Sequence, residues 1–300
     1  MISIIIPVYK KTELFLKNLK NNLRFFEDLD VIVINDDPNH SIKKYLKDFS
    51  NVRLYENKIN LGFGETVNKG ARLAKNKYLF LVNSDVEINN ELFKKALSHF
   101  KNIKDLFAVG FAQTEQNNEV VGRNTYFWKS GFFRHKANRK ISFGVNGWAE
   151  GGSSIFSKEK FIELGGFDSL YSPFYWEDID LSFRAWKKGY KVFFDPSILV
   201  KHFHESTIST YFSKRLIKKI SYRNQFIFIW KNITDINFLA SHFFLLPFNL
   251  IFFIVKGEVQ IISGFFAALF RINEILIKRQ KQQKDFNLTD KEVLKKTNEE

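Results

Sequence analysis

Polar residues follow one apolar stretch of this sequence in a way that suits metal binding. Asn83-Ser84-Asp85 comes directly after the run 78–82, so the carboxylate of Asp85 follows a strand that we expect to be buried. Mg²⁺ is typically held by one or two carboxylates, with water and phosphate oxygens in its other positions. The same triplet is also typical of a turn that uses Asn and Asp for local hydrogen bonds. Alone, it favours neither interpretation.

Three carboxylates fall within four positions in a second acidic segment, Trp176-Glu177-Asp178-Ile179-Asp180. Acidic residues favour the first turn of a helix because they complement its dipole, and that role needs no catalysis. Three carboxylates exceed what the helix end requires, and like charges so close together raise one another's proton affinity. One of them could therefore serve as a general base for a hydroxyl within hydrogen-bond reach.

Two further features are weaker by themselves. His202 follows a short apolar segment, and a lone histidine there is more often structural or solvent-facing than a metal ligand. Gly62 and Gly64 follow an expected strand and open an expected helix, where backbone amides can approach a phosphate, although a flexible turn would look the same. Val67 occupies the place of the third glycine in a dinucleotide fingerprint, so we reject a nicotinamide cofactor.

The elements that must position these side chains alternate along the first half of the chain. The expected strands are residues 3–8, 31–34, 52–55, 78–82 and 107–111, and the expected helices are residues 12–26, 41–49, 64–75 and 90–100. Such alternation predicts a largely parallel sheet with helices on both sides. Ligands of these sheets bind at the carboxyl ends of the strands, where Asp36 and Asp85 are expected to lie.

The second half of the chain is less regular in its pattern. Residues 113–147 carry scattered Gly, Asn, Arg and aromatic residues, and we expect an irregular excursion over the sheet edge that contributes ligand contacts. A helix over 177–188 is closed by Gly189, and two short strands are expected over 191–194 and 198–202.

The composition narrows the class of protein. A chain of 300 residues that is 45% hydrophobic and 26% charged suits one large α/β domain or one domain with an appendage. The absence of cysteine excludes a disulfide framework and a thiolate metal site. The net charge of +14 indicates an anionic partner: nucleic acid, anionic lipid or a phosphorylated ligand. No zinc-finger or RNA-binding signature accompanies the charge, so we expect no nucleic acid partner.

Together these segments resemble family 2 glycosyltransferases with the GT-A fold, a Rossmann-like, mostly parallel sheet flanked by helices. The segments that carry the resemblance are residues 3–9, 31–36, 60–64 and 81–87, followed by 164–168, 177–181, 184–185, 189–190, Pro196 and His202. The resemblance covers residues 2–207 in order. It is nearest to the bacterial rhamnosyltransferase-like branch that builds cell-surface polysaccharides.

The resemblance implies a site for a nucleotide-sugar donor. The implied residues are Pro7, Tyr9, Asn35, Asp36, Asn60, Gly62, Asn68 and Asn83. Asp36 falls where an acidic residue contacts the base or ribose, and Tyr9 is able to pack on the base. Asn35 and Asn83 stand where many relatives carry aspartate, which weakens any inference about the nucleotide. We expect a dTDP- or UDP-linked sugar.

The resemblance also implies roles for the acidic residues and for His202. Asp85 and His202 would hold Mn²⁺ or Mg²⁺ at the donor diphosphate. Asp178 would be the general base of a single displacement with inversion. Contacts with a lipid-linked or saccharide acceptor are expected from Trp176, Glu177 and Asp180.

Two other classes of protein compete with this interpretation. A nucleotidyltransferase should carry a glycine-rich phosphate loop with a basic signature near the N-terminus, and Pro7-Val8-Tyr9-Lys10 lacks it. A catalytically inactive nucleotide-sugar-binding protein of the same fold is opposed by the intact set Asp85, Asp178 and His202.

The character of the chain changes near residue 206, so we predict a catalytic domain over 1–205 and a basic, apolar helical extension over 206–300. Residues 238–255 form an apolar run interrupted by Ser241, His242, Pro247 and Asn249, which is short for a bilayer span. We expect this segment to lie on anionic lipid, with a soluble bundle or homodimer contact and true insertion as alternatives. The tail after residue 277 is expected to be frayed.

The expected location of the protein follows from both ends of the sequence. The apolar run at residues 2–8 has no basic region before it, so no secretory signal is predicted. The enzyme is therefore expected in the cytoplasm, peripherally attached to the inner face of the plasma membrane.

Overall fold

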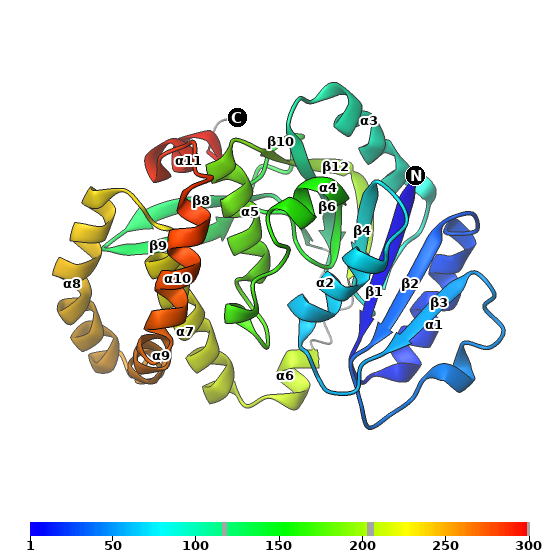
Figure 1. Cartoon of the computed structure of the whole chain (residues 1–300), viewed down its shortest axis with the longest axis horizontal. Coiled ribbons are helices and arrows are strands. Elements are labelled where there is room, and N and C mark those ends of the chain that lie inside the picture. The colour runs from blue at the N-terminus through cyan, green and yellow to red at the C-terminus, as the bar shows by residue number, and fades with distance from the viewer. Residues whose placement is uncertain (116–118, 203–206, 299–300) are drawn as a thin grey trace.

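The computed structural model describes residues 1–115, 119–202 and 207–298, which form an α/β fold (Figure 1). Within these residues a ten-stranded sheet has the order β10-β12-β6-β11-β4-β1-β2-β3, with β5 beside β12 and β7 beside β6. Its strands are β1 (Ile2–Val8), β2 (Asp30–Asn35), β3 (Val52–Glu56), β4 (Tyr78–Val82), β5 (Val86–Glu87), β6 (Leu106–Thr114), β7 (Val120–Val121), β10 (Gly144–Val145), β11 (Ser153–Ser157) and β12 (Lys191–His202).

The strand directions confirm the prediction of a mixed, mostly parallel sheet. β1 pairs in parallel with β2 and β4, and β2 pairs in parallel with β3. β6 and β12 are also parallel, whereas β11 runs antiparallel between β4 and β6. Almost every residue of β1, β2 and β4 is buried, as expected for strands that are covered on both faces.

Two hydrophobic cores cover the two faces of the sheet. Ile4 and Ile6 of β1 point to one face and belong to the same core as Phe15 of α1 (Thr12–Asn22). Ile5 points to the other face and shares a core with Val67 of α2 (Phe63–Leu73). This alternation along a strand follows from the two-residue repeat of the backbone. Further helices before residue 203 are α3 (Ala96–Asn102), α4 (Lys158–Glu163) and α5 (Glu177–Lys188).

Two local predictions were wrong. The helix expected over 41–49 is only a 3₁₀ turn at Lys43–Tyr45, because the Glu56 carboxylate accepts hydrogen bonds from the Ser41 hydroxyl and the Ile42 amide and holds an open loop. The two strands expected over 191–194 and 198–202 are one strand, β12, whose register shifts between Asp195 and Leu199.

The segment expected to be irregular contains a hairpin instead. β8 (Asn124–Lys129) pairs antiparallel with β9 (Phe132–Ala137) around Ser130 and Gly131, which have φ of 52° and 75°. Positive φ at both central residues is typical of a two-residue hairpin turn. The hairpin packs on the C-terminal helices, with the Phe133 and Phe228 rings 4.3 Å apart, so it does not lie loosely over a sheet edge.

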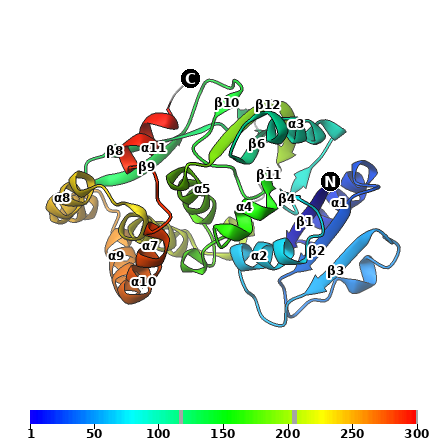
Figure 2. The same cartoon turned by 45° about the horizontal axis from the view of Figure 1, so that its top comes forward.

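The C-terminal helices fold back onto the part of the chain before residue 203 (Figures 1 and 2). They are α6 (Thr207–Tyr211), α7 (Lys214–Asn232), α8 (Ile236–Val255), α9 (Gln260–Leu269), α10 (Ile272–Gln283) and α11 (Asp290–Lys296). The boundary predicted at residues 205 and 206 lies outside the described residues. The tail is not frayed, because the buried Asp290 of α11 lies 2.7 Å from Nζ of the buried Lys187 in α5.

Candidate active site

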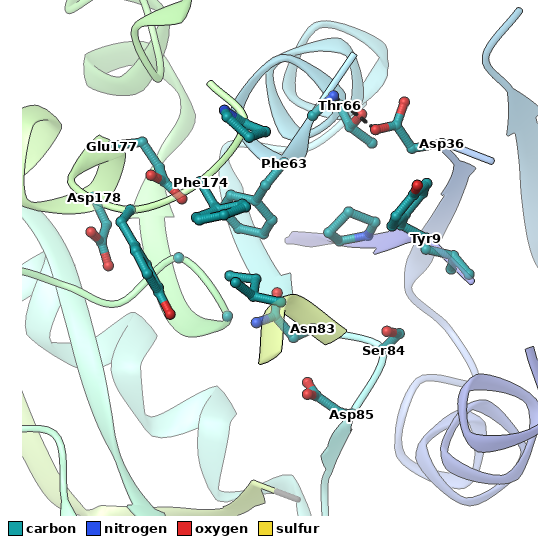
Figure 3. A pocket seen from close by; sticks show the side chains of 18 of the residues that line it. Tyr9, Asp36, Phe63, Thr66, Asn83, Ser84, Asp85, Phe174, Glu177 and Asp178 are labelled. Atoms are coloured by element: carbon teal, nitrogen blue, oxygen red, sulfur yellow. Dashed lines mark hydrogen bonds between the residues drawn. The ribbon is translucent and has the colours of Figure 1, made fainter. Parts of the chain in front are cut away.

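A cavity of about 450 Å³ opens beside the carboxyl ends of β1 and β4. Of the residues predicted for the site, it brings together Pro7, Tyr9, Asp36, Asn60, Gly62, Asn83, Asp85, Glu177, Asp178 and His202. In Figure 3, Tyr9 and Asp36 lie on one side and Glu177 and Asp178 on the other, with Asp85 between them. The acidic segments that are far apart in the sequence therefore share one cleft.

Asp36 organises one wall of this cleft. Its carboxylate accepts hydrogen bonds from the Asn57 amide and the Leu61 backbone N–H at 2.8 Å, and from the Gly62 N–H at 2.9 Å. Gly62 has φ of 79°, a conformation that a residue without a Cβ adopts at little cost. Asp36 thus fixes the loop before α2 against the cavity in addition to lining it.

Asp85 and His202 are brought together by strand pairing. β5 runs antiparallel to the end of β12, with Val86 opposite His202, and this places Asp85 Oδ1 3.3 Å from His202 Nε2. His202 Nδ1–H donates a hydrogen bond to Gln113 Oε1 at 2.7 Å. The amide nitrogen of Gln113 donates in turn to the Glu150 carboxylate, which fixes which end of the amide faces the histidine.

This chain of hydrogen bonds sets the tautomer of His202. With the proton on Nδ1, the Nε2 lone pair of the neutral ring points toward the Asp85 carboxylate, so two acceptors face one another. A proton or a cation between them relieves that repulsion. Burial disfavours the charged ring, but the hydrogen bond and charge of Asp85 outweigh it and raise the pKa of His202.

The pair also fits a divalent cation. Ligand atoms about 2.1 Å from one octahedral ion lie about 3 Å apart when they are at right angles. The 3.3 Å separation of Oδ1 and Nε2 is close to that value. Among the described residues, no cluster of three or more His, Asp or Glu side chains is suited to hold a metal. Water and phosphate oxygens are able to fill further positions around such an ion.

Gln113→Leu should weaken Mn²⁺ binding by about 10-fold to 100-fold, because partners that orient a metal-binding histidine typically contribute that much. Isothermal titration of the protein with Mn²⁺ measures the change. Gln225→Leu is the control, since Gln225 hydrogen-bonds the Phe133 carbonyl away from the cavity. Equal Mn²⁺ affinity in Gln113→Leu and the wild type would show that Gln113 does not orient His202.

Glu177 and Asp178 begin α5 directly after Tyr175 and Trp176, whose φ angles are 71° and 76°. Burial, followed by the nearby charge of Glu150, raises the pKa of Asp178 to about 7. Burial and the charge of Asp178 raise the pKa of Glu177 well above its usual range. Asp178 can therefore exchange a proton near neutral pH, and Glu177 keeps its proton to a higher pH than an ordinary glutamate does.

Asp180 does not reach the cleft. It is fully buried, and its oxygens accept hydrogen bonds from the Tyr171 hydroxyl at 2.7 Å, from Arg184 Nε at 2.8 Å and from the Asn232 amide at 2.7 Å. Burial opposes ionisation, but Lys231 and Arg184 lower the pKa of Asp180. The prediction that Asp180 contacts an acceptor is corrected by this placement, since the carboxylate anchors α5.

Three more predicted residues lie behind the cavity wall. Asn68 joins α2 to Phe167 by donating to its carbonyl at 2.8 Å and accepting from its N–H at 2.9 Å. The Asn35 amide donates to the His40 carbonyl at 2.7 Å. The Trp176 ring packs in the aromatic core behind α5. None of the three lines the cavity, so each supports the site from outside.

Several lining residues had no signal strong enough to be predicted. Gln113 and Glu150 belong to no motif, although they hold His202 in place. Gly152 could have been suspected from the Gly pair at 151–152, because a Cβ there would lie 2.3 Å from Asn83 Nδ2. Phe174 reaches toward the middle of the cleft in Figure 3.

Comparisons of sequence place these residues among known proteins. The sequence model described as "Glycosyl transferase family 2" matches residues 3–165. An uncharacterized glycosyltransferase, MJ1057 of Methanocaldococcus jannaschii, is 24% identical over 113 residues, which are 35% of this chain and 39% of that protein.

Solved structures show the same fold at low sequence identity. GalNAc-T7, solved with UDP, GalNAc and Mn²⁺, has a TM-score of 0.60 at 14% identity over 77% of this chain and 48% of its own. Mannosyltransferase PcManGT of Pyrobaculum calidifontis, solved with GDP-Man and Mn²⁺, has a TM-score of 0.54 at 12% identity over 99% and 85%. S. aureus TarS 1–349 with UDP-GlcNAc gives 0.55 at 16% over 98% and 90%. These likenesses confirm the expected GT-A fold.

Proposed function

From the premise that this chain belongs to glycosyl transferase family 2, whose sequence model matches more than half of it, we propose that it transfers a sugar from a nucleotide diphosphate to an acceptor hydroxyl. The observation that carries the proposal is the shared cleft. It combines a pair suited to a cation, Asp85 and His202, with a carboxylate suited to accept a proton, Asp178.

We propose that the nucleotide lies against Tyr9, Asp36 and the loop at Asn60, where Asp36 holds two backbone amides in place. Asp85 and His202 would hold Mn²⁺ or Mg²⁺ at the diphosphate, and such an ion stabilises the negative charge of the departing nucleotide. The Mn²⁺ in the solved structures of GalNAc-T7 and PcManGT supports this choice of ion.

The acceptor side of the proposed reaction depends on Asp178. Its carboxylate removes the proton of the acceptor hydroxyl as that oxygen bonds to the anomeric carbon and the bond from this carbon to the diphosphate breaks. Attack from the side opposite the leaving group inverts the configuration. In its protonated form, which burial favours, Glu177 beside Asp178 is able to donate a hydrogen bond to an acceptor oxygen.

A narrower proposal rests on the resemblance of the motifs to the rhamnosyltransferase-like branch. In that case the donor is a dTDP- or UDP-linked hexose or rhamnose. The acceptor is a saccharide or a lipid-linked saccharide of a bacterial cell-surface polysaccharide.

Thermal-shift measurements with UDP-, dTDP- and GDP-linked sugars test the proposed donor site. One nucleotide sugar should raise the Tm in the presence of Mn²⁺ and lose that effect when EDTA is added. Asp85→Ala should weaken the Mn²⁺-dependent affinity at least tenfold, about 1.4 kcal/mol or more.

Asp48→Ala is the control, because this exposed carboxylate lies outside the cavity. Nucleotide sugars that leave the Tm unchanged, or that act equally on Asp85→Ala, would contradict the assignment.

A further inference from the structure

One face of α8 is apolar and exposed along the whole helix. Phe244 is 73% exposed, Phe248 63% and Ile251 61%, and these residues are spaced at i, i+4 and i+7 on one side of the helix. The helix has 20 residues, none of them charged, and only 11% of its most apolar window is buried. α8 is therefore not a core helix of the fold, and an exposed apolar face of this kind marks an interaction site.

Three polar side chains of α8, those of Ser241, His242 and Asn249, turn toward the protein. His242 accepts a hydrogen bond from Trp230 Nε1 at 3.0 Å and donates one to the Gly131 carbonyl at 2.7 Å. Ser241 accepts from Trp128 Nε1, and Asn249 donates to the Ser130 carbonyl, both at 3.0 Å. The residues that interrupt the apolar run in the sequence thus tie α8 to the β8–β9 hairpin and to α7.

These hydrogen bonds indicate whether α8 spans a bilayer or lies on its surface. A helix of 20 residues is long enough to cross the hydrocarbon region. Crossing would strip His242, Ser241 and Asn249 of their hydrogen bonds to the folded protein and leave polar groups in lipid, which is costly. A helix with one apolar face and one face docked on a soluble domain suits half-immersion at the interface.

Basic residues gather near the turn between α8 and α9. Lys256 follows α8, with its Nζ 5.8 Å from the centre of the Phe252 ring. Lys218 of α7 reaches Glu258 in the same turn at 2.6 Å. Lys219 of α7 is exposed and lies beside α9. The two helices pack so closely there that a Cβ at Gly264 would lie 3.0 Å from the Lys219 carbonyl.

The charge of the protein distinguishes the two partners that an apolar face could have. A second copy of the chain would bring two molecules of net charge +14 together, and their charges repel. An anionic membrane surface attracts such basic residues while it accepts the apolar ridge. Charge complementarity therefore favours lipid.

We infer that the exposed face of α8 docks the protein peripherally on an anionic lipid bilayer. Phe244, Phe248 and Ile251 enter the boundary between headgroups and acyl chains, and the basic residues at the α8–α9 turn contact anionic headgroups. In Figures 1 and 2, α8 forms the end of the molecule opposite β3, so the nucleotide-binding strands remain away from the lipid.

Co-sedimentation with vesicles tests this inference without reference to sugar transfer. The wild type should bind phosphatidylcholine vesicles with 30% phosphatidylglycerol at least tenfold more tightly than pure phosphatidylcholine vesicles. The variant F244S/F248S/I251S should lose at least tenfold of that binding. The variant V120S/F143S/I162S is the control, since it removes three exposed apolar side chains elsewhere and should bind like the wild type.

A site-specific probe covers the case in which the triple variant fails to fold. The chain contains no cysteine, so Phe244→Cys and the control Ile162→Cys each accept one polarity-sensitive dye. Only the dye at position 244 should shift to the blue on anionic vesicles. Unchanged dye emission at position 244, vesicle binding by the triple variant equal to the wild type, or a dimer that F244S/F248S/I251S dissociates without any vesicle binding would overturn the inference.

Discussion

Asp178→Asn should lower turnover at saturating donor and acceptor by about 10²-fold to 10⁴-fold, the usual contribution of a positioned general base. The amide keeps the shape of the side chain but cannot accept the proton of the acceptor hydroxyl. Donor affinity should stay within a few-fold of the wild type, because the nucleotide is expected on the opposite side of the cleft. Steady-state transfer assays and donor titrations separate the two effects.

The pH profile supplies the second measurement for Asp178. The pKa of this carboxyl is raised to about 7, so the basic form is lost as the pH falls through that value. The wild-type kcat/KM should therefore drop tenfold for each pH unit below about 7 and be level above it. At saturating Mn²⁺, which competes with the proton on His202, this acid limb should be absent from the residual activity of Asp178→Asn.

Glu177→Gln is the matched control for the Asp178 substitution. Burial and the charge of Asp178 raise the pKa of Glu177 and favour its neutral form, so a neutral amide of the same size should cost less than tenfold in kcat. If Asp178→Asn turned over like the wild type while Glu177→Gln lost 10²-fold or more, the base would be Glu177.

Lys231→Met should destabilise the protein by about 3–5 kcal/mol, the usual cost of removing one partner from a buried ion pair. Lys231 is fully buried, and its Nζ lies 2.7 Å from carboxylates of both Asp168 and Asp180. Methionine fills similar space but leaves two buried carboxylates short of positive charge. Urea denaturation followed by tryptophan fluorescence measures the free energy of unfolding.

Lys218→Met is the control for the loss of stability expected in Lys231→Met. Its side chain is 53% exposed and pairs with Glu258 at the surface, so its removal should change the free energy of unfolding by about 1 kcal/mol or less. Equal losses in the two variants would mean that burial does not set the strength of the Lys231 contacts. The comparison also tests whether α7 is an integral part of the catalytic fold.

The sheet was predictable because its strands are short, β-branched and punctuated by polar residues. The runs at Ile2–Val8 and Tyr78–Val82 can hardly form anything except buried strands, and their parallel pairing follows from the helices between them. The pairing of Asp85 with His202 was expected only from the family resemblance and not from the pattern of residues around either side chain. It depends on β5 meeting the end of β12, a contact between distant segments that no local pattern contains.

The acidic segment at the start of α5 shows more clearly what a sequence pattern cannot predict. Asp178 and Asp180 are two positions apart, so their side chains point about 200° apart around the helix axis. Asp178 lines the cleft and Asp180 is buried against Lys231. The acidic segment alone does not predict which of the two faces the cleft. Gln113 was not predicted for a different reason. Its hydrogen bond to His202 requires no motif in the sequence around it.

The 19 residues of α7 make one uninterrupted rod of about 28 Å. Near its start, Lys218 reaches the turn beside the lipid-facing ridge, and farther along, Asn224 donates hydrogen bonds to the carbonyls of Phe174 and Tyr175 at the mouth of the cleft. The six residues from Lys218 to Asn224 span about 9 Å of this rigid helix, which makes it a spacer of fixed length between the two contacts. The height of the catalytic opening above a bilayer would then be set by the protein itself, and acceptors would be sorted by how far their hydroxyl extends from the membrane.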